Sequence, residues 1–157
     1  MTNLERLLVG LTELALAEDE KGRDKAKADL RDALSDTRSN RKTAEMLVRE
    51  IMAELGVPDA LVGHPYTVKA ILLCIEDENL INHITFRLYP AVAAHFDTTA
   101  ARVERGIRHL VEVTWTRGDT AAIDKYFRNT VNADKAKPTN GEFVARITNI
   151  VRVQISK

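Results

Sequence analysis

The stretch DTTAARVERGIRHLVEVTWTRG, from Asp97 to Gly118, contains four arginines and a histidine among the apolar residues of a half-buried helix. Advancing by 100° per residue, the step of an α-helix, places the two kinds of residue on opposite faces. The apolar face consists of Val103, Ile107, Leu110, Val111 and Thr114. The small or polar face consists of Ala101, Arg105, Arg108, His109 and Glu112, with Arg102 and Glu104 at the two borders. We therefore expect a helix from Thr99 to Arg117 that buries one face and presents cations on the other.

The segment before this helix has the spacing of a helix-turn-helix motif. Pro90 opens a short predicted helix, PAVAAHF, in which Ala93 lies four residues before Asp97 and ten before Val103. These are the positions of a small residue where two helices cross, a turn residue that tolerates a left-handed φ, and an inward β-branched residue. The generic motif has an apolar residue where this chain has Gly106, so the match is incomplete.

A helix in this position can contact DNA because an α-helix fits the major groove. Arginine pairs in a bidentate way with guanine, glutamate accepts from cytosine N4, and a helix N-terminus favours a phosphate. A solvated cationic face on a helix has the same spacing. The residues alone leave both interpretations open.

The charge is divided unevenly along the chain, although its total is zero. Residues 1–80 contain 11 Lys and Arg against 16 Asp and Glu, whereas residues 81–157 contain 12 against 7. Only the C-terminal half is therefore expected to meet a polyanion such as DNA.

Helical periodicity also dominates the N-terminal third. The charge-dense segment from residue 17 is expected to break at Gly22, and residues 37–40, TRSN, are expected to form a linker. Ser39 or Asn40 would then cap the next helix, which ends at Gly56. The first helix has its leucines at the i, i+3, i+4, i+7 spacing of an amphipathic helix: Leu4, Leu7, Leu8, Leu11 and Leu14.

Helices are also predicted in the rest of the chain. One starts near Pro65, one covers residues 78–88, one covers residues 119–131, and the last follows a capping box formed by Thr139 and Glu142. The inward residues of the last two are predicted to be Ile123, Tyr126, Phe127, Val131, Phe143, Ile147, Ile150 and Val151. No stretch predicts a strand, so we expect an all-α helical bundle of about eight helices with a helix-turn-helix.

The length of 157 residues allows one domain with its own core and a modest appendage. We expect residues 1–40 to be a helical extension and residues 41–157 to be the main domain. Cys74, in the apolar run AILLCIE, is predicted to be a buried thiol in a reducing compartment. The sequence has no signal peptide and no apolar run long enough to span a bilayer, which predicts a cytoplasmic protein.

Four segments together resemble the C-terminal effector domain of the sporulation master response regulator, stage-zero sporulation protein A. They are IMAELGVP near residue 51, LYPAVAAHF, TTAARVERGIRHLVEVTWTRG and KAKPTNGEFVA, and their order and spacing match over residues 42–152. The resemblance implies a six-helix DNA-binding domain. It also implies recognition of short boxes with a TGTCGAA-like core, often as tandem dimers.

The resemblance further implies a recognition helix that contacts bases and phosphates. Ala101 stands where the family has Ser, which removes one small polar contact. Gly106 stands where the family has Ala, which costs a helix about 0.5–1 kcal/mol. Lys135 and Lys137 match the basic loop before the last helix, where they either contact phosphate or remain solvated. Five recognition positions keep the family residue type: Arg102, Glu104, Arg105, Arg108 and His109.

The N-terminal region departs from the family pattern. The family normally begins with a phosphoacceptor receiver domain built on a parallel sheet, whereas residues 1–40 show helical periodicity without apolar strands. The chain is therefore expected to act without an aspartyl-phosphate switch.

The leucine face of residues 4–14 needs a partner surface, because burying each Leu stabilises by roughly 1.5–3 kcal/mol. It could fold back on its own domain or form a homodimer that sets the spacing of DNA half-sites. It could also dock onto another protein, such as a full-length regulator or RNA polymerase.

The sequence shows no pattern of an enzyme, a cofactor site or a metal site. Its four histidines have no second ligand at zinc spacing, one Cys cannot build a structural zinc site, and no phosphate-binding Gly loop is present. We therefore predict a sequence-specific DNA-binding transcription regulator of the sporulation effector family. The alternative is an interaction protein that antagonises a full-length regulator through its N-terminal helices.

Overall fold

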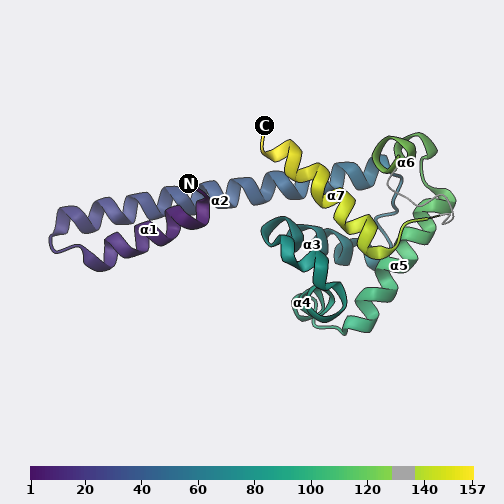
Figure 1. Ribbon diagram of the computed structural model, residues 1–157, viewed down its shortest axis with the longest axis horizontal. Helices are drawn as coiled ribbons and strands as arrows, with labels where there is room; N and C mark the ends of the chain where they lie inside the picture. The colour runs from purple at the N-terminus through teal and green to yellow at the C-terminus, as the bar shows by residue number, and fades with distance from the viewer. Residues whose placement is uncertain (129–136) are drawn as a thin grey trace. The chain divides into compact units, whose positions relative to one another are not determined.

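The computed structural model describes residues 1–128 and 137–157, and these residues form helices and no strand (Figure 1). The prediction of an all-α fold is therefore confirmed for the described residues. The chain divides into two compact units, Met1–Thr43 and Ala44–Lys157. None of the helices described is long and apolar enough to cross a membrane.

The first unit is a helical hairpin made by α1 (Asn3–Leu16) and the first part of α2 (Glu20–Glu54). α1 begins with a capping box in which Thr2 and Glu5 each accept a hydrogen bond from the other's backbone N–H. Gly10 lies where the helices meet, because a Cβ at this position would be 2.9 Å from the Leu30 side chain. Ala26 is buried in the same unit, so the two helices of the hairpin pack together through small residues.

Two expectations about the course of α2 are wrong. Gly22 does not break the helix but lies in its first turn, where its N–H donates to the Asp19 carboxylate at 2.7 Å. The predicted linker at residues 37–40 is helical throughout. The sequence explains this result, because no Gly or Pro interrupts it between Gly22 and Gly56. The Thr37 hydroxyl also donates to the carbonyl four residues earlier, so it does not compete with the helix.

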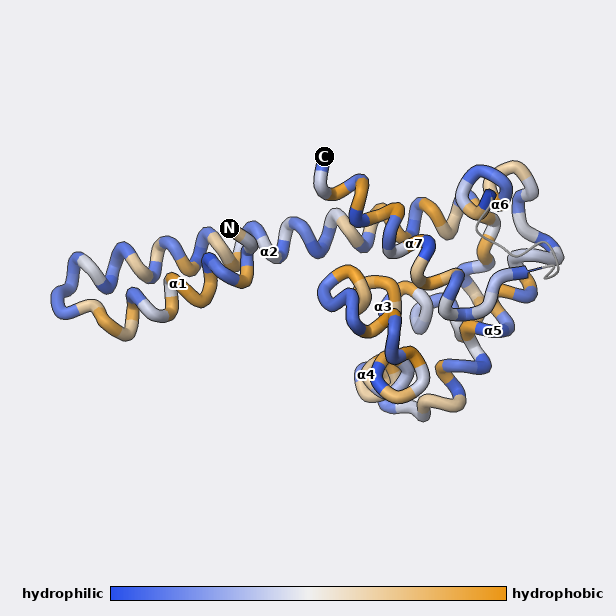
Figure 2. The backbone as a smooth tube through the Cα atoms, viewed as in Figure 1, coloured by the Kyte–Doolittle hydropathy of each residue, from blue (hydrophilic) through white to orange (hydrophobic). Residues whose placement is uncertain are grey.

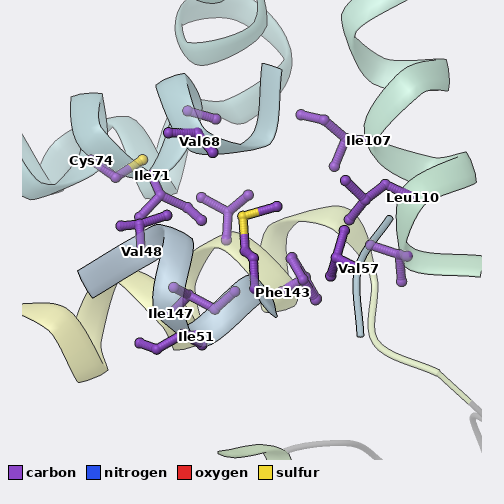
Figure 3. Close-up of a cluster of buried hydrophobic side chains, with 14 of the residues drawn as sticks. Val48, Ile51, Val57, Val68, Ile71, Cys74, Ile107, Leu110, Phe143 and Ile147 are labelled. Atoms are coloured by element: carbon purple, nitrogen blue, oxygen red, sulfur yellow. The ribbon is translucent and has the colours of Figure 1, made fainter. Parts of the chain in front are cut away.

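The second unit surrounds one apolar core. It contains the end of α2, α3 (Gly63–Glu76), α5 (Ala100–Arg117), α6 (Thr120–Phe127) and α7 (Asn140–Ile155). Figure 3 shows side chains from four of these helices meeting in the interior, and Figure 2 shows hydrophobic residues recurring at intervals along α3 and α7. Core residues labelled there include Val48, Ile51, Ile71, Cys74, Ile107, Leu110, Phe143 and Ile147.

The predicted helix over residues 78–88 has a different form. A 3-10 helix, η1 (Glu78–His83), is followed by a π-helical turn, η2 (Ile84–Leu88), which leads directly into α4 (Tyr89–His95). The N–H of Tyr89 donates to the carbonyl of Ile84, five residues earlier. Pro90 explains the wider turn, because a proline inside a regular α-helix clashes with the carbonyl four residues before it.

The last two helices agree with most of the predicted inward positions. Phe127 stacks on Phe143 with ring centroids 5.4 Å apart, and Trp115 meets both rings edge-on. Tyr126 is buried. The capping box of Thr139 and Glu142 is present as predicted. Val131 lies outside the described residues.

Candidate nucleic-acid interface

α4 and α5 form the predicted helix-turn-helix. Asp97 has a φ of 51° and is the one non-glycine residue with a positive φ in the described part of the chain. A short polar residue tolerates this left-handed conformation better than a bulky one. The N–H of Thr98 donates to the carbonyl of Ala93 at 3.0 Å, and Ala93 and Val103 are buried on either side of the turn. The three positions identified by spacing therefore have the expected conformation and burial.

The start of α5 combines a capped N-terminus with exposed cations. The Thr99 hydroxyl caps the helix by accepting from the Arg102 N–H at 3.2 Å. Arg102 and Arg105 are exposed on the first two turns. The positive end of the helix dipole and these two cations therefore lie at the same end of α5, an arrangement that favours phosphate.

The two faces of α5 are those predicted from the sequence. The inward residues are all buried: Val103, Ile107, Leu110, Val111 and Thr114. The outward residues are exposed, apart from the half-buried Glu104: Ala101, Arg102, Arg105, Arg108, His109 and Glu112. The helix is thus held by one face and displays a cationic surface on the other.

Two acids lie among the outward cations of α5. Arg108 forms an ion pair with Glu104 one turn earlier. Glu112 accepts a hydrogen bond from Lys137 at 2.8 Å, and this bond and the lysine's charge hold the pKa of Glu112 below its usual value. Arg102 and Arg105 have no ion pair within residues 1–128 and 137–157. Arg102 and Arg105 are therefore open cations on the first two turns of the helix, and Arg117 on its last turn is exposed as well.

Gly106 has a packing role that the sequence did not reveal. α5 crosses the start of α3 here, and a Cβ at Gly106 would lie 3.2 Å from the Cα of Gly63 and 3.1 Å from Cδ2 of Tyr66. The small residues on both helices allow the backbones to approach closely. This contact holds the middle of α5 against α3. Gly106 therefore lowers the helix propensity of α5 but also allows α5 to pack closely on α3.

Asn140, the first residue of α7, links this helix to α4 and α5. Its side-chain Nδ2 donates to the backbone carbonyl of Glu104 and to the Tyr89 hydroxyl, both at 3.1 Å. Tyr89 is buried, and this burial raises its pKa. The bridge lies in a groove of about 750 Å³ that runs along the side of α5 to Lys137. In the sequence, Asn140 is marked only by its place directly after the capping Thr139, so it was not predicted as a site residue.

Residues 48–151 match the family described as "Sporulation initiation factor Spo0A C terminal". The match covers more than half of the chain and includes the whole helix-turn-helix. The chain belongs to the Spo0A C-terminal family. This family consists of DNA-binding regulatory domains of sporulation, which agrees with the cationic outer face of α5.

Of the two loop lysines predicted to contact phosphate in this Spo0A C-terminal fold, only Lys137 lies in the described part of the chain. Lys137 is placed beside α5 by its ion pair with Glu112. Lys135 lies outside the described residues. Of the predicted DNA contacts, the structure therefore gathers those on α5 and Lys137 along one side of this unit.

Two reactive groups of this Spo0A-type unit, the Cys74 thiol and the His64 imidazole, lie in its interior. Cys74 is buried, and burial raises the pKa of its thiol to about 11, so the thiolate nucleophile does not form near neutral pH. His64 is also buried, and its pKa is lowered for the same reason. No group of three His, Cys, Asp or Glu that could hold a metal occurs among the described residues.

Proposed function

We propose that this chain is a sequence-specific DNA-binding transcription regulator that inserts α5 into the major groove. The observation that supports it best is the open state of Arg102 and Arg105. An arginine face engaged by acids would favour a different role, whereas these two guanidinium groups have no acidic partner among the described residues. They are available for guanine or for phosphate.

Glu104 and Arg108 are proposed to act as a pair. Glu104 is half-buried and its carboxylate contacts Arg108, so it is placed to orient that guanidinium toward a base edge. Bidentate recognition of guanine requires a fixed guanidinium plane, which such a partner provides. His109 and Ala101 complete the proposed surface, with Lys137 and Lys135 contributing phosphate contacts at its edge.

The proposed target is duplex DNA with a TGTCGAA-like box. Fluorescence anisotropy on this duplex and on a scrambled one of the same length and composition tests the proposal. We expect tighter binding to the box, with both affinities falling as salt rises because phosphate contacts release counterions. Equal affinities for the two duplexes would contradict sequence-specific binding.

We also propose that binding does not depend on an aspartyl phosphate within this chain. Residues 1–43 form two helices and contain no strand that could end in a phosphoacceptor Asp. The chain as expressed should therefore prefer the box without a phosphodonor. A requirement for acetyl phosphate in the binding assay would contradict this part of the proposal.

An interaction protein that antagonises a full-length regulator remains the second candidate, because α1 exposes several leucines to solvent. The comparison of the box duplex with the scrambled duplex distinguishes the two candidate functions. An antagonist of this kind would show no box preference of its own but would lower the affinity of the full-length regulator for its box.

A further inference from the structure

α2 covers only part of the leucine face of α1. Gly10 is buried, and Leu7 and Leu14 are half-buried beside it. The remaining leucines are more than half exposed: Leu4 at 66%, Leu8 at 55% and Leu11 at 55%. The five leucines therefore do not form one uniform surface, and those turned away from α2 are not covered by other residues of the unit Met1–Thr43.

The spacing of the leucines predicts a second neighbour for α1. Leu4, Leu7, Leu11 and Leu14 follow alternating steps of three and four residues, the a and d positions of a heptad. Gly10 marks the direction of α2, and at 100° per residue the centre of the leucine seam is about 80° away from it. A helix with one neighbour centres its apolar residues on that neighbour, whereas a bundle helix centres them between two neighbours.

α2 exposes an apolar residue on the same flank of the hairpin. Arg6 and Asp36 form an ion pair at 2.6 Å, which places these sides of the two helices together on one flank. By the helical step, the leucine seam and Leu34 both lie on the opposite flank. Leu34 is 56% exposed. The residues around it on α2 are basic and line a shallow groove: Lys27, Arg31 and Arg38.

We propose that the flank formed by the leucine seam and Leu34 binds a second copy of this chain, so that two hairpins form a four-helix bundle. In this bundle α1 of each copy packs beside α2 of the other. This assembly goes beyond the proposed DNA contacts, because it uses only residues of the first unit and involves no DNA.

The charges on the flank favour this arrangement over the alternative. If α2 packed beside the second α2, the cations Lys27, Arg31 and Arg38 of the two copies would face one another. α1 has one basic residue, Arg6, and it pairs with Asp36 on the other flank. The basic edge of α2 therefore meets no like charge when it lies against the α1 helix of the second copy.

The size of the hairpin also favours a second copy. In the unit of residues 1–43, the fully buried side chains of α2 are only Ala26 and Ala33, and Leu30 beside Gly10 is half-buried. Units of about 40 residues usually need a disulfide, a metal or oligomerisation to be stable. The one Cys of the chain, Cys74, lies elsewhere, so a disulfide is not available to the hairpin.

Light scattering after size exclusion tests the assembly on the whole chain without DNA. The expected mass is twice the chain mass of 17.6 kDa. Leu4→Glu and Leu11→Glu should each give the mass of one chain with unchanged helical circular dichroism, because both residues belong to the seam and are exposed. Leu16→Glu is the matched control on the same helix: Leu16 is 73% exposed but lies off the seam, so this variant should keep the doubled mass. A single-chain mass for the unsubstituted protein, or a doubled mass for Leu11→Glu, would overturn the proposal.

Cross-linking tests which helices are neighbours. Arg6 lies beside Asp36 and Gly10 beside Leu30, so Leu7 of the seam is level with Leu34 on α2. Chains with Leu7→Cys and chains with Leu34→Cys, co-expressed and oxidised, should form a disulfide-linked pair. Either variant alone should remain mostly unlinked, since Cys74 is buried. Strong linking of Leu7→Cys chains to one another, without a mixed product, would overturn the arrangement of α1 beside α2.

The test of the two-copy assembly and the test of DNA binding can fail independently of each other. A monomeric Leu11→Glu variant should still prefer a single box over a scrambled duplex, although with lower affinity for two adjacent boxes. Failure of the box preference in every variant would count against the DNA proposal and leave the measured mass unaffected.

Discussion

Gly63 lies against Gly106 where α3 crosses α5, so closely that a Cβ on Gly63 would be 2.0 Å from the Gly106 carbonyl oxygen. This contact joins the start of one helix to the middle of the proposed recognition helix. It leaves no room for a side chain at residue 63, because the atom that would be struck belongs to the backbone of α5.

Gly63→Ala should therefore destabilise the protein strongly. Overpacking of this kind costs about 1–3 kcal/mol, and here it would also push α5 outward. Gly106→Ala should have a much smaller effect, because its contacts of 3.1–3.2 Å are less severe and Ala gains about 0.5–1 kcal/mol in helix propensity. Urea denaturation followed by circular dichroism measures both changes. Equal stabilities of Gly63→Ala and the unsubstituted protein would show that the crossing is looser than described.

Arg105→Ala should weaken binding to the box without unfolding the domain. Loss of one bidentate contact costs about 1–3 kcal/mol in discrimination between the box and a scrambled duplex. The side chain is exposed, so the stability should change little. Arg117→Ala at the other end of α5 is the matched control, since it removes the same charge from the same helix. If both variants bound the box equally well, the assignment of Arg105 as a base contact would be wrong.

Asn140→Ala should reduce stability and box affinity together. The substitution removes the donor to the Glu104 carbonyl and to the Tyr89 hydroxyl. Leaving such groups without a partner costs about 1–3 kcal/mol. Tyr89→Phe is a useful comparison, because it removes one of the two hydrogen bonds and leaves the bond to α5. Its effect on box affinity should be the smaller of the two, and the opposite order would contradict a role for Asn140 in positioning α5.

The stability of the second unit should fall with acidification partly because of His64. Burial lowers the pKa of His64; the charge of Asp59, at 3.4 Å, opposes this shift and that of Arg49 adds to it. The unfolded chain has the higher pKa and protonates first, so the free energy of unfolding decreases as pH falls from about 6.5 through the folded pKa.

His64→Gln isolates this contribution. The difference in unfolding free energy between this variant and the unsubstituted protein should shrink as pH falls from about 7.5 to about 5. A constant difference over that window would show that His64 does not titrate differently in the folded and unfolded chains.

Local spacing was sufficient to predict the helix-turn-helix. Ala93, Asp97 and Val103 are separated by fixed intervals, and both faces of α5 follow from a 100° step. The same approach failed for α2, since Ser39 and Asn40 resemble caps wherever they occur. Only the absence of Gly and Pro over more than thirty residues indicated one continuous helix.

The remaining features depend on contacts between distant segments. Gly63 and Gly106 are far apart in the chain, and neither residue type alone indicates that they touch. The bridge of Asn140 likewise requires α4, α5 and α7 to be in place. Periodicity describes one helix at a time, so it cannot predict such pairs.

The most direct test of the central claim is the ratio of affinities for a duplex with a TGTCGAA-like box and for its scrambled counterpart, measured by fluorescence anisotropy at several salt concentrations. A sequence-specific regulator should bind the box more tightly by a factor of at least about 10³, the lower end for specific DNA-binding proteins. Both affinities should fall as salt rises. A ratio near one, at salt concentrations where both duplexes bind, would contradict the proposal that α5 recognises bases.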